Sequence, residues 1–305
     1  MVAYTVRRLL WLAVVLFFVA AVTFAMMHAV PGGPWDREKT LAPSVVENLN
    51  RRYGLDLPLW HQFAKYMGSI LRGDLGVAYT YQDRPVTDII LQGLPTTATL
   101  GLLALAFALA FGLSLGILAA LRQNSLIDYG SVAFATFGAS VPNFVIGIIL
   151  VVVLAVRLRW LPTGGWGSAE QAVMPVLALG ALPAAYLARV TRASILEALR
   201  QEYVRTAWAK GLPEQVIILR HVLRNALIPV LTLAGPIAVN LVTGSFIVET
   251  IFSIPGIGRL FVQGVFQRDY GLIMGTVLFY AFLVALANLM VDLLYAVVDP
   301  RIRYS

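Results

Sequence analysis

Apolar residues in this chain fall into six long runs, which polar or charged segments separate. A helix needs about 20 apolar residues to cross about 30 Å of hydrocarbon, and each run approaches or exceeds that length. The pattern therefore predicts an all-α integral membrane protein with six transmembrane helices. The runs cover residues 9–30, 97–121, 132–156, 172–188, 226–248 and 272–298.

Basic residues at the ends of the runs predict the orientation of the helices. Arg7 and Arg8 precede a first run that is longer than the core of a signal peptide, about 7–15 residues, so it is expected to remain as a transmembrane helix. Six helices place both chain ends on one side of the membrane. If that side is the cytoplasm, twelve Lys and Arg lie inside and four lie in the short outer loops. The expected topology is N-in and C-in.

Composition indicates a membrane protein without chemistry of its own. Of 305 residues, 59% are hydrophobic and 13% are charged, against about 25% charged residues in soluble domains. The net charge is +7. The charged residues lie between the apolar runs, which favours a role in membrane topology over nucleic-acid binding. The chain has no cysteine, three widely separated histidines and no P-loop motif. Disulfides, a clustered metal site and ATP binding through a P-loop are therefore not expected.

One acidic residue, Asp292, lies well within a predicted span, four residues after Asn288. A membrane aspartyl protease needs two carboxylates, and a proton-coupled carrier usually needs several ionisable groups. We interpret Asp292 and Asn288 as a contact between helices, with a path-lining role as the alternative. The chain therefore looks like a passive conduit driven by something else, and no catalytic residue is assigned.

The polar segment of residues 31–95 is placed outside the membrane. Ser44 and Glu47 fit a capping box, and Gly54 is expected to end the helix that they begin. A second, amphipathic helix is expected to begin at Pro58 and to lie on the membrane surface or on the helix ends. The chain is thus divided into a first helix (1–30), an outer segment (31–95), a five-helix core (96–298) and a cytoplasmic tail (299–305).

The most informative stretch is the polar segment of residues 201–229, which lies between two apolar runs. Residues 189–224 carry seven Lys and Arg against three acids. One interpretation is a cytoplasmic loop whose charges only fix the topology. The other is a short, stiff elbow that docks against a second protein, centred on a cytoplasmic loop of residues 193–226.

Local signals predict the shape of this elbow. Apolar residues recur at steps of three and four and predict one face of an amphipathic helix. Lys210 and Gly211 are expected to end that helix, and Pro213 suits the first turn of another. The residues on the apolar face are Leu196, Leu199, Tyr203 and Ala207.

Taken together, these segments resemble the permease subunit of ABC importers for dipeptides, oligopeptides and nickel, in particular the first of the two paired permeases. The resemblance covers essentially the whole chain and lies in several short motifs, in order. They are GDLG at 73–76, LPTT at 94–97, YVRTA at 203–207, AKGL at 209–212, His221 with RNA at 224–226 and Pro229, ETIF at 249–252, PGIG at 255–258 and DPRIRY at 299–304.

The resemblance implies a type I importer bundle in the cell membrane of a prokaryote. It also implies a second homologous permease, two ATP-binding subunits that hold ATP and Mg²⁺, and an outer substrate-binding protein, with no cofactor on this chain. The basic elbow would be the coupling helix that docks in the ATPase. Its residues would be Tyr203, Val204, Arg205, Thr206, Ala207, Lys210, Gly211, Leu212, Pro213, His221 and Arg224.

The elbow departs from the general importer pattern of Glu-Ala-Ala, Gly and Ile-x-Leu-Pro. Arg205, Thr206 and Ala207 replace Glu-Ala-Ala, and the closing proline is delayed to Pro229. Contacts that depend on the leading Glu therefore do not carry over.

Two further sets of residues are assigned by hypothesis. An outer gate or binding-protein contact is placed at Glu249, Phe252, Pro255, Gly256 and Gly258, with a structural turn as the alternative. The translocation path is placed at Asn143, Asn240, Thr243 and Ser245. Alternative cargoes for the same architecture are nickel chelates, opines or oligosaccharides. Alternative functions of a different class are a stand-alone secondary carrier and a membrane-bound enzyme.

Overall fold

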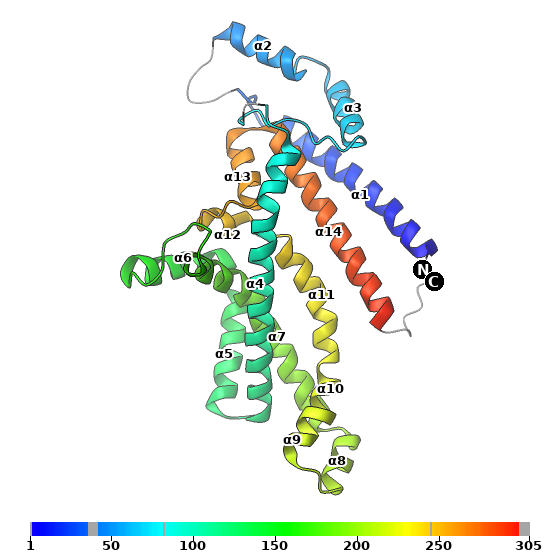
Figure 1. The fold of residues 1–305 in the computed structure, drawn as a ribbon, viewed down its shortest axis with the longest axis vertical. Coiled ribbons are helices and arrows are strands. Elements are labelled where there is room, and N and C mark those ends of the chain that lie inside the picture. The colour runs from blue at the N-terminus through cyan, green and yellow to red at the C-terminus, as the bar shows by residue number, and fades with distance from the viewer. Residues whose placement is uncertain (1, 36–41, 82, 245, 299–305) are drawn as a thin grey trace. The chain divides into compact units, whose positions relative to one another are not determined.

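The computed structural model describes residues 2–35, 42–81, 83–244 and 246–298, and most of them are helical (Figure 1). The chain divides into two compact units. Unit 1 comprises Met1–Thr97 and Pro255–Ser305, and unit 2 comprises Ala98–Ile254. The chain passes between them once inside the long helix α4 (Val86–Leu121) and once directly after Ile254.

Unit 1 is built on the packing of α1 along α14, where Ala20, Met274 and Leu278 are buried. Helix α3 packs one apolar face, including Phe63, against this cluster. A second cluster joins the first turns of α4 to α13 and α14. The helices are α1 (Val2–Ala29), α2 (Pro43–Tyr53), α3 (Leu59–Ile70), the first part of α4, α13 (Ile257–Gln267) and α14 (Tyr270–Val298).

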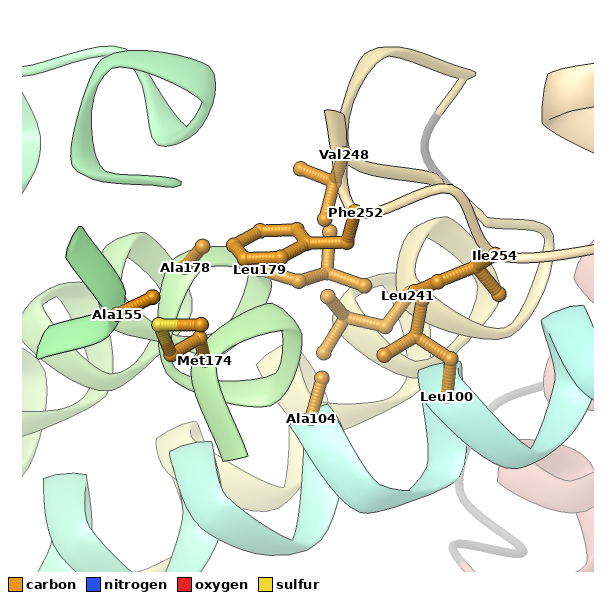
Figure 2. Close-up of a cluster of buried hydrophobic side chains, with 10 residues drawn as sticks. All are labelled: Leu100, Ala104, Ala155, Met174, Ala178, Leu179, Leu241, Val248, Phe252 and Ile254. Atoms are coloured by element: carbon orange, nitrogen blue, oxygen red, sulfur yellow. The ribbon is translucent and has the colours of Figure 1, made fainter. Parts of the chain in front are cut away.

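Unit 2 is organised around α7 (Ala169–Leu199), which contacts α5, α6, α10, α11 and α12. Figure 2 shows one of its buried clusters, in which Phe252 lies among side chains from α4, α7 and α11. The other elements are α5 (Leu126–Ser140), α6 (Asn143–Leu150), η1 (Val151–Arg157), α8 (Glu202–Ala209), α9 (Glu214–Val216), η2 (Ile217–Val222), α10 (Leu223–Ala226), α11 (Ile228–Val242) and α12 (Phe246–Ile251).

The predicted fold class is confirmed. Five helices in the described residues are long and apolar enough to cross a membrane, and six are counted if the bent pair α5 and α6–η1 forms one span. The second span begins earlier than predicted, at Val86, because residues before the apolar run, including Ile89 and Ile90, are buried in unit 1. The fourth continues further, to Leu199.

The predicted span over residues 132–156 is not one continuous helix in the structure. Leu126–Ser140 and Asn143–Arg157 meet at an angle of 106°. Val141 is extended, with φ −100° and ψ 122°, which is the conformation that a following proline favours. Pro142 therefore breaks the run instead of merely bending it.

The outer segment confirms some local predictions and corrects one. Helix α2 ends at Gly54 in the left-handed conformation, and α3 begins directly after Pro58, as predicted. The predicted capping box is wrong, because the N-cap is Ala42, with no side-chain cap, and Pro43 occupies the first helical position.

Of the other predictions, Ser245 and residues 299–305 lie outside the described residues, as does the side chain of Asp292.

Helix α5 approaches α7 closely at Gly138. A Cβ on Gly138 would lie 2.7 Å from Ala185 Cβ, so Gly138→Ala is expected to lower the free energy of unfolding by about 1–2 kcal/mol. Gly130→Ala on the same helix meets no atom within 4 Å and should be neutral or stabilising by up to about 1 kcal/mol. Thermal unfolding of the purified chain in detergent measures both, and equal losses would contradict the steric explanation.

Candidate coupling site

Residues 200–227 form a compact helical elbow between α7 and α11, called the elbow from here on (Figure 1). Helix α8 comes first, a corner at residues 210–213 follows, and α9, η2 and α10 lead into α11. If both chain ends lie in the cytoplasm, as predicted, the elbow lies on the cytoplasmic side of the membrane.

Backbone hydrogen bonds fix the corner of the elbow. The Gly211 N–H donates to the Trp208 carbonyl at 2.9 Å, and the Leu212 N–H donates to the Ala207 carbonyl at 3.4 Å, which is the pairing of a Schellman motif. That motif needs a left-handed residue after the helix, and Gly211 supplies it with φ +71°. Pro213 then accepts two amide hydrogen bonds from the next turn. The predicted stop and restart are confirmed.

An apolar core holds the elbow to the ends of α4 and α7. Val204 and Ala207 lie three residues apart on α8 and are 0% and 4% exposed. They pack in one cluster with residues of α4, α7, η2 and α10, namely Ala120, Ile195, Ala198, Ile217, Val222 and Ala226. Because such cores are close-packed, a displacement of α8 must move the ends of α4 and α7 with it.

The opposite face of α8 is exposed and mixes aromatic and charged side chains. Tyr203 and Trp208 are 38% and 49% exposed. Arg205 pairs with Glu202 at 2.8 Å, but both side chains are exposed, so the pair adds little stability. Exposed aromatic residues commonly anchor protein interfaces. The other exposed predicted residues of the elbow are Thr206, Lys210, Gly211, Pro213 and Arg224.

The structure corrects the predicted apolar face. The chain is not one helix through residues 196–207, because α7 ends at Leu199 and α8 begins at Glu202. The break changes the helical phase, so Val204 points inward where the pattern placed Tyr203. Trp208 was not among the predicted coupling residues, although it is exposed on the same helix as Tyr203.

His221 lies in η2 and is half-buried, and its carbonyl accepts a hydrogen bond from the Asn225 side chain at 3.4 Å. Among the described residues, no group of three His, Cys, Asp or Glu side chains is placed to hold a metal ion. A coupling role for His221 stays a prediction.

An ion pair between the buried Asp128 and the partly buried Arg192 links α5 to α7 one turn before the elbow core. Asp128, at the start of α5, is 2% exposed and accepts hydrogen bonds from Arg192 Nε and, at 2.8 Å, from Arg192 Nη2. Asp128 also accepts a hydrogen bond from the Asn124 N–H at 2.9 Å. Sequence reasoning missed this pair, because an acid at a helix start and an Arg in a basic stretch are each ordinary.

The predicted outer gate is largely buried in this structure. Glu249 and Phe252 are both 0% exposed. The Phe252 carbonyl accepts a hydrogen bond from the Gly165 N–H at 2.7 Å, and a Cβ on Gly164 would lie 2.5 Å from the same oxygen. These two residues therefore belong to a tightly packed turn, which agrees with the alternative that this segment is a structural turn.

The remaining gate residues lie in unit 1 and lead into α13. Pro255 is exposed, whereas Gly256 and Gly258 are buried. The Ile257 N–H donates to Thr97 Oγ1 at 2.9 Å, which fixes the start of the helix. A gating or binding-protein role for the segment stays a prediction.

Two family models match nearly the whole chain. Residues 1–101 match the N-terminal model of the binding-protein-dependent transport system membrane component. Residues 112–304 match the binding-protein-dependent transport system inner membrane component. The chain belongs to this permease family.

Curated relatives align with the permease from end to end. The oligopeptide transport system permease protein OppB of Salmonella typhimurium is 42% identical over 306 residues, covering 100% of both chains. The dipeptide transport system permease protein DppB of Bacillus subtilis is 40% identical over 303 residues, covering 99% of the permease and 98% of its own chain.

Two solved transporters share the fold at lower sequence identity. The MetNI methionine ABC transporter aligns with a TM-score of 0.57 and 20% identity, over 70% of the permease and 97% of the other chain. An amino acid ABC transporter aligns with a TM-score of 0.56 and 19% identity, over 68% and 93%. The fold of the permease is therefore that of an ABC importer permease.

Three of the four residues predicted to line the path lie in the described part of unit 2, in a helix or directly after one. Asn143 is half-buried in the first turn of α6, and Asn240 is exposed on α11. Thr243 is 5% exposed, and its hydroxyl donates to the Val239 carbonyl at 2.8 Å, so its hydrogen bonding is satisfied by its own helix. Their role in the path stays a prediction.

Proposed function

We propose that this permease forms half of the translocation pathway of an ATP-driven importer for di- and oligopeptides. The proposal for the cargo rests on end-to-end identity of 40% or more with permeases named for oligopeptide and dipeptide transport. The proposal that ATP-binding partners power transport rests on one observation. The elbow is preformed, with an exposed aromatic and basic face and a core shared with α4 and α7.

The chain itself is non-catalytic and needs partners. These are a second homologous permease, two ATP-binding subunits that carry ATP and Mg²⁺, and an outer protein that delivers the peptide. The elbow is the surface on which one ATP-binding subunit docks, through Tyr203, Arg205 and Trp208. The gate and path residues named above act on the peptide within the membrane.

Alternating access follows from differential binding of the ATPase to two states of the permease. Closure of the ATP-binding subunits stabilises one state and their opening stabilises the other, so the equilibrium shifts only by that difference in binding free energy. The fixed Gly211 corner lets the elbow move as a rigid body. Its core then transmits the motion to the ends of α4 and α7 without an ordering step.

Reconstitution in proteoliposomes separates this proposal from a stand-alone carrier. The complete importer, with ATP inside and the binding protein outside, is expected to accumulate a labelled tripeptide. The permease alone in an ion gradient is expected not to do so. Gradient-driven uptake by the permease alone would overturn the proposal.

Trp208→Ala tests the docking surface directly. Loss of an aromatic anchor at the centre of an interface is expected to weaken binding of the ATP-binding subunit about tenfold. Trp160→Ala is the matched control, because Trp160 is also exposed but lies in the loop before α7, far along the chain from the elbow. Co-purification at graded subunit concentrations measures both, and equal affinity of the two variants would place the docking surface elsewhere.

A further inference from the structure

Two adjoining hollows in unit 1 have no role in the mechanism above. A groove of about 510 Å³ lies between the C-terminal half of α1 and the start of α3. A cavity of about 270 Å³ lies next to it, lined by α1, α3, α14 and the loop around Asp74. Phe24 and His28 line both, so the two spaces share a wall.

The groove is apolar and lies along a membrane span. Alanines at steps of four on α1 form one side, and aromatic and aliphatic side chains of α3 form the other. Helix α1 is a candidate span that ends at Ala29, which places the groove at the outer end of the hydrocarbon. Trp60, on its rim, is 71% exposed, as is typical of side chains at the membrane interface. A groove of this kind suits an acyl chain.

Three charged side chains line the cavity, and Arg52 pairs with Asp83, which leaves one cation and one anion that form no ion pair with each other. Lys65 and Asp74 both line it, and neither forms an ion pair with any residue that the structure describes. Asp74 accepts one hydrogen bond, from the Gly76 N–H at 2.8 Å. Opposite charges around one small cavity fit a zwitterionic ligand, since each charge then meets a partner.

A buried hydroxyl points to the same conclusion. Tyr66 Oη is buried and has no hydrogen-bond partner among the described residues, which is rare for a buried polar atom. Burial raises the pKa of the Tyr66 phenol, so it stays a neutral donor at physiological pH. Tyr53 and Tyr79, with ring centroids 4.3 Å apart, also line the cavity, and the Arg52 guanidinium lies over the Tyr53 ring.

We propose that the two hollows together bind one phospholipid of the outer leaflet whose headgroup carries a phosphate and a primary ammonium, as in phosphatidylethanolamine. The acyl chain lies in the groove, the phosphate meets Lys65 and Tyr66, and the ammonium meets Asp74. Asp74 disfavours a purely anionic headgroup. A peptide is disfavoured because its backbone would lie unpaired in the apolar groove.

Native mass spectrometry of the full chain in mild detergent tests the ligand. Phosphatidylethanolamine, phosphatidylglycerol and trialanine are added separately to delipidated protein. We expect half-occupancy by phosphatidylethanolamine at a concentration about tenfold lower than for phosphatidylglycerol, and no specific adduct of trialanine. Equal occupancy by both lipids, or retention of trialanine instead of lipid, would overturn the proposal.

Variants locate the site with matched controls. Ala25→Phe fills the groove, and Lys65→Met removes the lining cation that has no ion-pair partner among the described residues. Each is expected to reduce phosphatidylethanolamine occupancy about tenfold. Met26→Phe, on an exposed position of α1 outside the groove, and Arg72→Met, outside the cavity, should bind as the unaltered chain does. Occupancy that is the same in all four variants would exclude this site.

Tyr66→Phe distinguishes binding from folding. Without lipid, removal of an unpartnered buried hydroxyl should leave the melting temperature unchanged or raise it. With phosphatidylethanolamine present, the lipid-induced rise in melting temperature should be smaller than in the unaltered chain. A lower melting temperature without lipid and an unchanged lipid-induced rise would show that the hydroxyl serves the fold and not the lipid.

Discussion

Gly211→Val is expected to abolish coupled transport while the membrane fold survives. At φ +71° a β-branched residue is strongly disfavoured, at a cost of about 1–3 kcal/mol. No atom lies within 4 Å of a Cβ built at this position, so the effect comes from the backbone angle and not from a clash. The corner relaxes, its Schellman hydrogen bonds are lost, and the exposed face of α8 turns away from its partner.

A small misplacement of a docking surface has a large functional effect. We expect peptide uptake and peptide-stimulated ATPase activity of the reconstituted importer to fall at least about a hundredfold in Gly211→Val. The yield of the variant and its elution as a complex with the second permease should stay as in the unaltered chain, because the strain is confined to a loop.

Gly211→Asn is the matched variant. Asn also adds a branched side chain but adopts the left-handed conformation several-fold more readily than other non-glycine residues. It should therefore retain most of the uptake. If both variants lose transport equally, a side chain at position 211 obstructs docking and the corner geometry is not the cause. If both transport normally, the rigid corner is not needed for coupling.

The corner could be predicted from sequence because its signals are local. A cation, a glycine and a proline within four residues end one helix and begin the next, whatever surrounds them. The same reasoning located Gly54 and Pro58 in the outer segment, where the structure has the helix end and the helix start. Short-range backbone preferences of this kind do not depend on the tertiary fold.

The face that α8 buries could not be predicted as readily. The apolar pattern continues through residues 196–207 as if one helix covered them, but Arg200 and Gln201 interrupt it. Neither is a glycine or a proline, so the sequence carries no strong stop. The break rotates α8, and Val204 becomes the buried residue in place of Tyr203.

The bend at Pro142 could not be predicted for a different reason, because here the sequence does contain a helix-breaking residue. Its proline was visible within the predicted span, yet the run of apolar residues on both sides is long enough to suggest one helix. A proline inside a membrane helix is often tolerated, as Pro175 and Pro183 are in α7. The choice between a kink and a break depends on the neighbours that pack there, and those are not contained in the local pattern.

Asp128→Asn is expected to have the largest effect on stability, lowering the free energy of unfolding of the permease by about 3 kcal/mol. Asp128 is 2% exposed and receives hydrogen bonds from two nitrogens of Arg192, which is 26% exposed. Asn keeps the shape but removes the charge, so the guanidinium is left without its counter-ion in a partly buried position. The midpoint of thermal unfolding in detergent measures the change.

A double-mutant cycle separates the ion pair from the other contacts of these side chains. Arg192→Met alone leaves the buried Asp128 carboxylate unpaired and should also be strongly destabilising. Combining Arg192→Met with Asp128→Asn removes both charges, so the total loss should be smaller than the sum of the single losses. Additive losses would mean that Asp128 acts through its bond from the Asn124 N–H and not through Arg192.

The exposed pair of Glu202 and Arg205 provides the control for this cycle. Both side chains are mostly exposed, so Glu202→Gln should change the free energy of unfolding by less than about 0.5 kcal/mol. Arg192 lies one turn before Ile195, which belongs to the elbow core, so loosening α7 at the ion pair also loosens the support of α8. Asp128→Asn should therefore reduce uptake as well as stability, whereas Glu202→Gln should leave stability intact whatever it does to docking.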